Sequence, residues 1–186
     1  MNDSFYIQKY LDGNSKAFDK LYKKYIEKIY KFVFYKTMHK ESAEDLTSTV
    51  FFKALDNLEK FDDSKSKFQT WLFNIARNTV IDHYRTQKTN SNIEDFWSIA
   101  DSNHLETTIG NNLKIEEVKK YLKTLTPEQR EIVILRVWEG LSYKEIASII
   151  GKSENACKVS FSRSAQKLKD NILLIIIFGQ IINLIK

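Results

Sequence analysis

One proline and five glycines in 186 residues leave this chain few places for a sharp turn. Sheets with many strands need a turn every few residues, and those turns favour Gly, Pro, Asn and Asp. No segment alternates apolar and polar residues regularly enough to indicate a strand. The chain is therefore expected to be all-α, with long helices joined by short turns.

Helix boundaries are marked by capping signals. In a capping box, two side chains three residues apart bond the backbone N–H groups at the helix start. Three places fit it: Ser66-x-x-Gln69, Thr126-Pro127-Glu128-Gln129 and Ser142-x-x-Glu145. Ser42-x-x-Asp45 is a looser form, and Gly140 and Gly151 are stop signals after helical runs. Helices are expected near residues 3–11, 14–37, 42–59, 67–87, 112–124, 127–139, 143–150 and 154–170.

A polar stretch at 86–111, rich in Asn, Ser, Thr and Asp, divides this pattern into two helical modules. Within it, Phe96 and Trp97 indicate contact with another surface. The expected parts are a first module at 1–88, a linker at 89–111, a second module at 112–170 and an apolar tail at 171–186.

Several function classes are disfavoured by the residues present. Cys157 is the single cysteine, so the chain can form neither an internal disulfide nor a cysteine-based zinc cluster. No glycine-rich phosphate loop, metal-ligand cluster or nucleophile–base motif appears, and the three histidines are scattered. We therefore expect no enzyme activity and no cofactor. The first residues lack a secretory pattern, which makes the cytoplasm the expected location.

The distribution of charge along the chain is more informative than the formal net charge of +5. Residues 39–63 hold seven acids against three lysines, and residues 89–112 hold four acids and no Lys or Arg. Residues 65–88 and 151–169 each hold five bases against one acid. Two basic segments separated by an acidic one favour an anionic partner for the basic segments.

Residues 141–168 predict a helix-turn-helix. A short capped helix ends at Gly151, and a second begins after Ser153. The second helix has a stripe at helical spacing that is expected to be buried, consisting of Cys157, Phe161, Ser164 and Leu168. Its other face is polar and basic, which suits phosphates and base edges in the major groove. A helical hairpin with a merely solvated basic face remains the alternative.

The first module holds two helices of interest. Residues 43–55 begin acidic and continue apolar, which fits either the helix dipole alone or a docking surface with an acidic rim. Residues 68–85 carry apolar side chains over roughly 220° of the helix, more than twice the stripe of about 100° that one packing face needs. The remaining strip contains Asn74, Arg77, Asn78 and Arg85. It indicates either a central bundle helix with incidental arginines or a basic groove for single-stranded DNA.

Together these segments resemble an RNA polymerase sigma factor of the extracytoplasmic-function type, within the sigma-70 family. The segments "GNSKAFDKLYKKYIEKIYKFV", "AEDLTSTVFFKAL" and "FQTWLFNIARNTVIDHYR" are similar to successive helices of sigma region 2. The segment from "LKTLTPEQREIV" to "SRSAQKL" is similar to region 4. The resemblance implies a subunit that binds core RNA polymerase and directs promoter recognition and DNA opening.

The resemblance also implies roles for individual residues. Docking on the β′ clamp helices of core polymerase falls to Asp45, Leu46, Phe51, Phe52 and Leu55. Contact with the opened −10 element falls to Trp71, Asn74, Arg77, Asn78 and Arg85, with loop 61–68 capturing a flipped base. Reading of the −35 element falls to Ser153, Asn155, Lys158, Ser162 and Arg163. The second module would also touch the β flap, and an anti-sigma factor is expected as a further partner.

This chain departs from the family pattern at three places. Ser48-Thr49 stands where the family often has Gln-Glu, which predicts a weaker polar contact with core polymerase. In the second helix of the helix-turn-helix, Ser160 replaces a common Arg, and Ala156-Cys157 replaces a common Thr-Val. Fewer cations there predict weaker or different −35 recognition.

The apolar tail, "NILLIIIFGQIINLIK", does not follow from the resemblance. As a helix it would span roughly 22 Å, short of the ~30 Å hydrocarbon core of a membrane. We expect it to pack on the second module or on a partner such as an anti-sigma factor, with a position in a membrane interface as the alternative.

Two other functions stay open at the level of sequence. One is a helix-turn-helix regulator that does not bind core polymerase, and the other is a signalling protein held at a membrane by the tail.

Overall fold

The computed structural model describes residues 2–87 and 118–168, and the chain divides into two compact units, 1–93 and 94–186. Helices and turns make up the described residues, which contain no strand, so the all-α prediction is confirmed. The predicted linker at 89–111, with Phe96 and Trp97, and the tail at 171–186 lie outside the described residues. Each unit is described by itself below.

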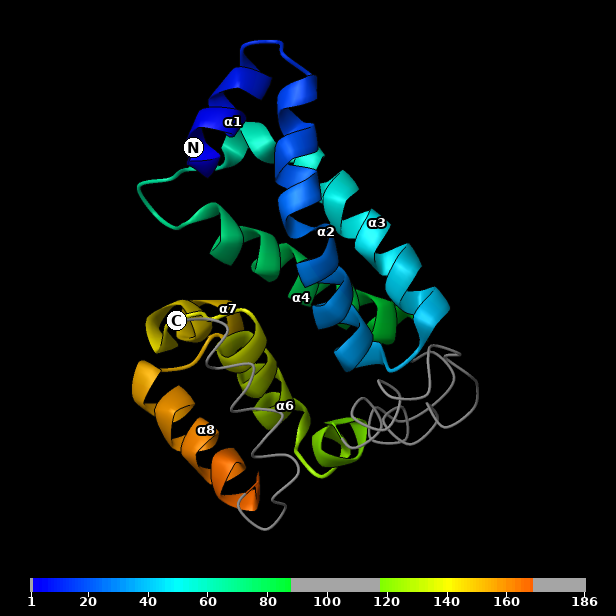
Figure 1. The fold of residues 1–186 in the computed structure, drawn as a ribbon, viewed down its shortest axis with the longest axis vertical. Helices are drawn as coiled ribbons and strands as arrows, with labels where there is room; N and C mark the ends of the chain where they lie inside the picture. The colour runs from blue at the N-terminus through cyan, green and yellow to red at the C-terminus, as the bar shows by residue number, and fades with distance from the viewer. Residues whose placement is uncertain (1, 88–117, 169–186) are drawn as a thin grey trace. The chain divides into compact units, whose positions relative to one another are not determined.

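Over residues 2–87, unit 1 is a bundle of four helices and a short 3₁₀ turn. The elements are α1 (Asp3–Leu11), α2 (Lys16–Thr37), α3 (Lys40–Asp56), η1 (Leu58–Lys60) and α4 (Phe68–Gln87). The long helix α2 contacts α1, α3 and α4, and α3 also packs on α4 (Figure 1). The core lies among α2, α3 and α4, where Phe32 and Phe73 meet edge to face with ring centroids 5.2 Å apart.

The corner between α2 and α3 is made without glycine. Met38 ends α2 in the left-handed region at φ +54°, and its N–H donates to the carbonyl of Phe34 at 2.6 Å. His39 then caps α3, because its Nδ1 accepts the N–H of Ser42 at 3.2 Å. The prediction that α3 begins at Ser42 was therefore wrong. A histidine ring nitrogen takes the place of the usual hydroxyl or carboxylate, and the helix begins at Lys40.

Helix α1 is fastened to α2 by the carboxylate of Asp3. The hydroxyl of Tyr25 donates to one Asp3 oxygen at 2.6 Å, and Lys24 donates to the other at 2.6 Å. Ile7 is buried on the same helix. A polar contact at one end and an apolar contact in the middle thus hold α1 along α2.

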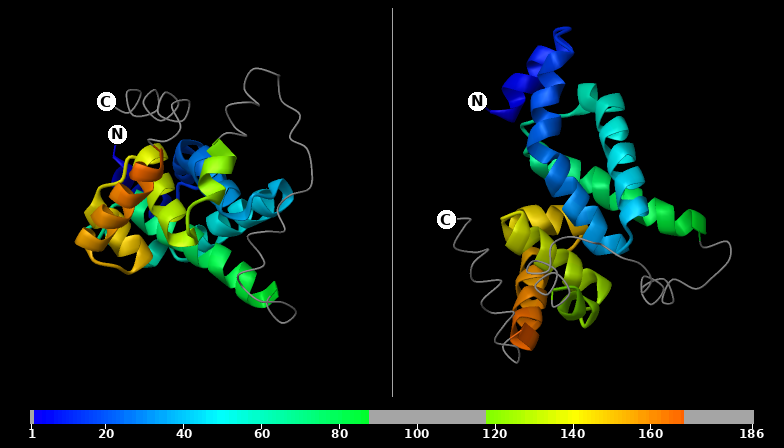
Figure 2. Two further views of the ribbon diagram at one scale, coloured as in Figure 1. Left: turned by 90° about the horizontal axis from the view of Figure 1, so that it is seen from below. Right: turned by 45° about the vertical axis from the view of Figure 1, so that its right-hand side comes forward.

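Unit 2 contains the predicted helix-turn-helix. Residues 118–123 are helical and are followed by α6 (Pro127–Val133), the π-helical turn η4 (Ile134–Trp138), α7 (Tyr143–Ile150) and α8 (Glu154–Leu168). Helix α8 packs against both α6 and α7 (Figure 2). The capping boxes at Thr126/Gln129 and Ser142/Glu145 are both present with reciprocal bonds. Gly140 and Gly151 adopt φ +65° and +72°, so both stop signals are confirmed.

Tyr143 joins three elements of unit 2. The guanidinium of Arg136, in the π-helical turn, lies 4.7 Å from the Tyr143 ring centroid, and its Nη1 donates to the carbonyl of Leu141 at 2.8 Å. From α8, the ring of Phe161 lies 5.9 Å from Tyr143, and the ammonium of Lys158 lies 6.0 Å away. The start of α7 is therefore braced against both the turn before it and the helix after it.

Replacing Tyr121 by phenylalanine is expected to lower the free energy of unfolding by about 1 kcal/mol, the usual net value of a buried hydrogen bond. The buried Tyr121 hydroxyl donates to the carbonyl of Ser164 in α8 at 2.7 Å, which links the helical residues 118–123 to α8. Urea unfolding followed by circular dichroism measures the change. Tyr22→Phe is the matched control, since Tyr22 is 42% exposed, whereas Tyr121 is buried; an equal loss in both variants would refute the assigned role.

The same hydroxyl makes stability depend on alkaline pH. Burial raises the pKa of Tyr121 to about 12, whereas a tyrosine in an unfolded chain titrates near 10. The contribution of this group is therefore fully present below about pH 10 and is lost as the pH rises through about 12. The free energy of unfolding of the native chain should decrease across this pH range. The Tyr121→Phe variant should lack the part of the decrease that comes from this hydroxyl.

Candidate nucleic-acid interface

Helix α8 has a polar face exposed to solvent and an opposite face that packs on the other helices of unit 2. Ser153 caps the helix, because its Oγ accepts the N–H of Ala156 at 3.1 Å. The predicted reading residues after it are all exposed, and they are Asn155, Lys158, Ser162 and Arg163. The structure therefore places the five predicted −35 residues along α8 between Ser153 and Arg163.

The opposite side of α8 follows the predicted stripe. Cys157 and Ser164 are fully buried, and Phe161 is half-buried against Tyr143. The side chain of Leu168 lies outside the described residues. Burial, and next the nearby carboxylate of Glu128, raise the pKa of the Cys157 thiol, which stays protonated at neutral pH. Cys157 is thus a small packing residue, as predicted.

Charges on the exposed side of α8 are partly paired. Lys158 and Glu154 form an ion pair one turn apart at 2.9 Å, and both side chains are about half exposed. Such a pair is weak in water, so a phosphate can replace Glu154 as the partner of Lys158 at small cost.

Val159 also lies on this exposed face, and it was not among the residues predicted to read DNA. Its side chain is 42% exposed and lies between the polar residues already named. The available signal was a branched apolar residue one turn after Asn155 and one turn before Arg163, on the side of the helix that carries the polar residues.

Helix α4 confirms the wide apolar arc predicted for 68–85. Its buried side chains are Phe68, Leu72, Phe73, Ala76 and Val80, which face α2 and α3. The predicted −10 residues occupy the remaining side: Asn78 and Arg85 are exposed, whereas Trp71, Asn74 and Arg77 are half-buried. The arc is thus packing, and the polar strip is its solvent side.

An open groove of about 350 Å³ runs beside Trp71 and Asn78, between α4 and the end of α3. Its other wall carries Lys53, Asn57 and Lys60, which the sequence analysis missed. Their spacing of four and three residues was the available signal, since it places them on one face. Two amides, two ammonium groups and an indole around one groove can hold a negatively charged chain that carries flat rings.

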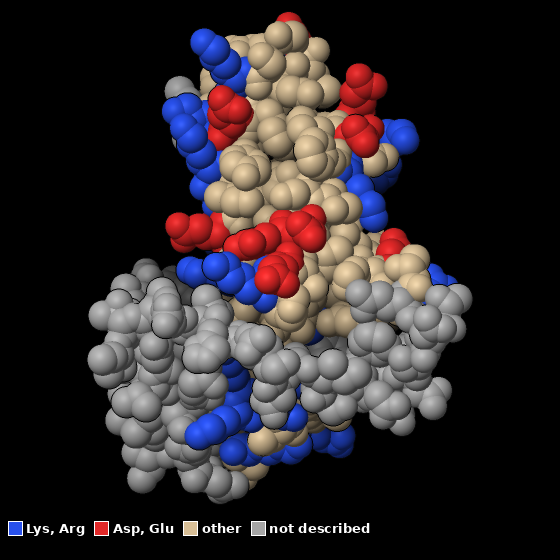
Figure 3. Space-filling model, turned by 90° about the vertical axis from the view of Figure 1, so that its right-hand side faces the viewer, with Lys and Arg blue, Asp and Glu red and all other residues tan. Residues whose placement is uncertain are grey.

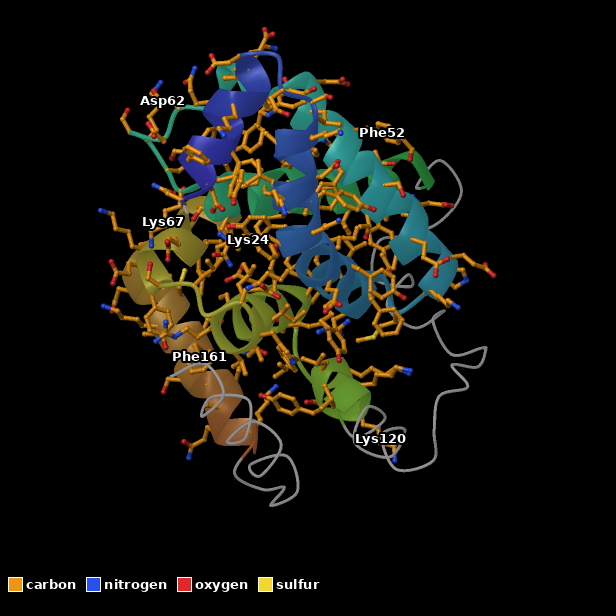
Figure 4. The ribbon with its side chains drawn as sticks, turned by 45° about the horizontal axis from the view of Figure 1, so that its top comes forward. Lys24, Phe52, Asp62, Lys67, Lys120 and Phe161 are labelled. Carbon is orange, nitrogen blue, oxygen red and sulfur yellow. The ribbon has the colours of Figure 1, made fainter. Side chains whose placement is uncertain are left out.

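The loop from Phe61 to Lys67 is organised by Asp62 (Figure 4). The backbone N–H and the hydroxyl of Ser64 donate to Asp62 Oδ1 at 3.0 and 2.6 Å, and Lys65 pairs with Oδ2 at 3.0 Å. The Ser64 hydroxyl and then Lys65 lower the pKa of Asp62 to about 2. At the start of the loop, the Phe61 ring packs 5.3 Å from Trp71. The loop is therefore an ordered turn set against the groove.

The five docking residues predicted on α3 divide into two groups. Phe52 is 68% exposed and projects from the helix (Figure 4), Asp45 is exposed, and Leu55 is half-buried. Leu46 and Phe51 are only 7% and 4% exposed, so they belong to the core of unit 1. Phe51 packs on Tyr22 with ring centroids 4.7 Å apart. Of the five residues predicted for docking, α3 therefore exposes only Asp45, Phe52 and part of Leu55.

Acidic side chains gather on the α3 side of unit 1, beside a wide uncharged area (Figure 3). A second groove, of about 290 Å³, lies between α2 and α3 and includes Glu27, Tyr30 and Glu44. Burial, and then the charge of Glu44, raise the pKa of Tyr30. This side of the unit suits a partner with basic and apolar groups.

Two family models match the chain, and they cover both units. The model of sigma-70 region 2 matches residues 21–89, and the model of sigma-70 region 4 matches residues 115–168. The chain belongs to the sigma-70 family. It falls in the extracytoplasmic-function group, as its relatives do.

Three curated sigma factors from two bacteria illustrate the similarity. BldN of Streptomyces coelicolor is 32% identical over 84% of this chain, which spans 60% of the length of BldN. YlaC of Bacillus subtilis is 31% identical, with 84% of this chain and 92% of YlaC covered. SigM of the same species is 32% identical, with 81% and 92% covered.

Solved sigma-factor structures share the fold. The sigma factor RpoE of Bartonella quintana, crystallised with the anti-sigma factor NepR, matches with a TM-score of 0.70 and 25% identity. The match covers 86% of this chain and 97% of that one. CnrH in complex with the cytosolic domain of CnrY matches with a TM-score of 0.69 at 23% identity, over 90% and 95% of the two chains.

In sigma-70 terms, unit 1 carries region 2 and unit 2 carries region 4. The region 2 match begins inside α2, so α1 and its Asp3 contact precede it. No helix among residues 2–87 and 118–168 is long and apolar enough to cross a bilayer. Over the same residues, no group of three His, Cys, Asp or Glu side chains could hold a metal ion.

Proposed function

We propose that this sigma factor binds core RNA polymerase through α3, holds the opened −10 strand on α4, and reads the −35 element with α8. It works in the cytoplasm without catalytic activity of its own. The observation that carries the proposal is that one chain contains both a region 2 unit and a region 4 helix-turn-helix. A regulator that uses only the helix-turn-helix has no need of the α3 surface or the α4 groove.

Docking on core polymerase is assigned to Asp45, Phe52 and Leu55. Phe52 is the most exposed large apolar side chain among the described residues, and an aromatic anchor of this kind often dominates an interface. Leu46 and Phe51 support the surface from inside. The β′ clamp helices are the proposed partner, and the acidic groove between α2 and α3 would receive their basic side chains.

The departure at Ser48-Thr49 is visible in the structure. Ser48 Oγ donates to the carbonyl of Glu44 at 3.1 Å, and Thr49 Oγ1 donates to that of Asp45 at 2.9 Å. Both hydroxyls are occupied within their own helix, where Gln and Glu side chains would reach outward. This supports a docking contact that depends mainly on Phe52 and its apolar neighbours.

Opening of the −10 element is assigned to α4 and the groove beside it. Trp71 offers part of its ring for stacking, and Asn74 and Asn78 can bond base edges. Arg77 and Arg85 supply positive charge along the same side, while Lys53 and Lys60 supply it from the opposite wall. Single-stranded DNA is held by this combination of cations and aromatic rings.

Reading of the −35 element is assigned to the start of α8, while another surface of unit 2 would touch the β flap. Ser160, at the position of a common arginine, is half-buried, and its carbonyl accepts the hydroxyl of Ser164 at 2.8 Å. It therefore adds no cation to the reading face. An anti-sigma factor is proposed as a further partner, as in the Bartonella complex.

Reconstituted transcription tests the proposal. The purified chain is added to core RNA polymerase, and transcript starts are mapped on genomic DNA. Binding to core and initiation at a defined set of promoters are expected. DNA binding without any complex with core would instead establish the helix-turn-helix regulator.

Replacing Lys158 by alanine should weaken promoter binding at every sequence and make its salt dependence shallower. One lost phosphate contact lowers the slope of log K against log salt by about 0.9. Binding measured between 50 and 200 mM salt, about the usual range for such work, gives the slope. Lys20→Ala, which removes the same charge from an exposed site on α2, is the control. A slope unchanged in Lys158→Ala would exclude a phosphate contact.

A further inference from the structure

Val159 lies in the middle of the reading face of α8 without a packing role. It is 42% exposed, while the inward side of the helix is filled by Cys157 and Ser164, both fully buried. At 100° per residue, Val159 lies about 160° from Cys157, on the side of Asn155 and Ser162. The side chain therefore points where the polar reading residues point.

Helix stability gives no reason for a valine at this position. A β-branched residue loses side-chain freedom in a helix and is a poorer helix former than Lys, Gln or Ala. Buried contacts do not compensate for this here, because nearly half of the side chain is open to solvent. The polar neighbours make the position different from a scattered surface valine.

Two of the residues beside Val159 are short. Ala156 and Ser162 are exposed on this face, and the longer Lys158 and Arg163 beside them carry the charges already assigned to the −35 element. A helix with such a surface can lie close to the base edges. A short apolar side chain can then reach them directly.

Thymine is the base that offers an apolar group in the major groove, its C5 methyl. We propose that Val159 contacts the C5 methyl of a thymine in the −35 element and makes this chain selective for an A·T pair at that position. The inference rests on the proposed function, since it requires α8 to lie in the major groove. It adds a specificity-determining residue to the polar ones already assigned.

Deoxyuridine substitution tests the contact, because deoxyuridine lacks only the C5 methyl of thymidine. The −35 element is first located from mapped transcript starts, and each of its thymines, on either strand, is then replaced singly. Promoter binding is measured with polymerase carrying the full chain. One position should lose about fourfold in affinity, the usual effect of one buried methyl group.

Variants of the protein connect that loss to Val159. Val159→Ala should bind the thymine and uracil promoters equally at the sensitive position, whereas Val159→Ile, which keeps the branched apolar surface, should retain the difference. Gln166→Ala, an exposed site two turns further along the same face, is the control and should also retain it.

Three results would overturn the proposal for Val159 alone while initiation remains normal. In the first, no uracil substitution changes the promoter affinity of the native protein. In the second, Val159→Ala loses the same affinity on uracil substitution as the native protein does. In the third, the −35 element contains no A·T pair. Failure of the proposed function looks different. In that case the chain forms no complex with core polymerase, or it does not protect a −35 region on DNA. Either result would refute both the proposed function and the Val159 contact.

Discussion

Replacing Phe52 by alanine is expected to weaken binding to core RNA polymerase at least 30-fold. An aromatic residue at the centre of an interface commonly contributes about 2 kcal/mol or more, which corresponds to roughly that factor. Because the ring is 68% exposed, its removal should leave the stability of unit 1 within about 0.5 kcal/mol of the native value. Titration of labelled chain with core polymerase measures the affinity, and urea unfolding checks the stability.

Phe5→Ala provides the matched control for Phe52. Phe5 is also an exposed phenylalanine of unit 1, at 40%, but it lies on α1, ahead of the region 2 match. Its loss should leave core affinity unchanged. If Phe5→Ala weakened binding as much as Phe52→Ala, or if neither did, the docking surface would have to lie away from the exposed side of α3.

Replacing Arg77 and Arg85 together by alanine is expected to reduce open-complex formation about 100-fold. Two charge-assisted contacts to the opened strand, at the lower value of about 1.5 kcal/mol each, give a factor of this order. Core affinity should change little, because the two side chains project from α4 rather than from the docking side of α3. Fluorescence of 2-aminopurine placed in the −10 element reports the opening, and the core titration is repeated on the same protein.

A second double variant separates the role of these arginines from a simple loss of charge. Lys16→Ala with Lys20→Ala removes two exposed cations from α2 and leaves α4 intact. Its open-complex formation should stay near the native level. Equal losses of opening and core affinity in the arginine variant would tell against a role of the strip in DNA opening.

Helices and their order were predictable because the signals are local. Thr126 with Gln129 and Ser142 with Glu145 form their capping boxes within four residues, and Gly151 ends α7 by its own backbone freedom. The wide arc of α4 was also readable, since residues such as Phe73 and Ala76 repeat at helical spacing. Each of these signals needs no knowledge of the rest of the fold.

Features that depend on contacts between elements were not predictable. The cap of α3 is a histidine placed by a left-handed Met38, which no capping pattern indicates. The groove beside Trp71 takes one wall from α3 and η1, so its lysines are found only when the helices are packed. The same packing buries Leu46 and Phe51, which an apolar pattern cannot distinguish from exposed Phe52.

The Tyr143 contacts have a consequence for how unit 2 meets DNA. Tyr143, which is itself braced by Arg136, packs on Phe161 of α8, and Tyr121 donates a hydrogen bond to the carbonyl of Ser164 on the same helix. Its reading face is therefore preorganised, and binding need not fold the helix first. The heat-capacity change of promoter binding by this unit should be small and should reflect surface burial alone, unlike that of basic regions that become helical only on DNA. A few short side chains can then be enough for sequence selectivity, because little of their binding free energy is lost in ordering the helix that carries them.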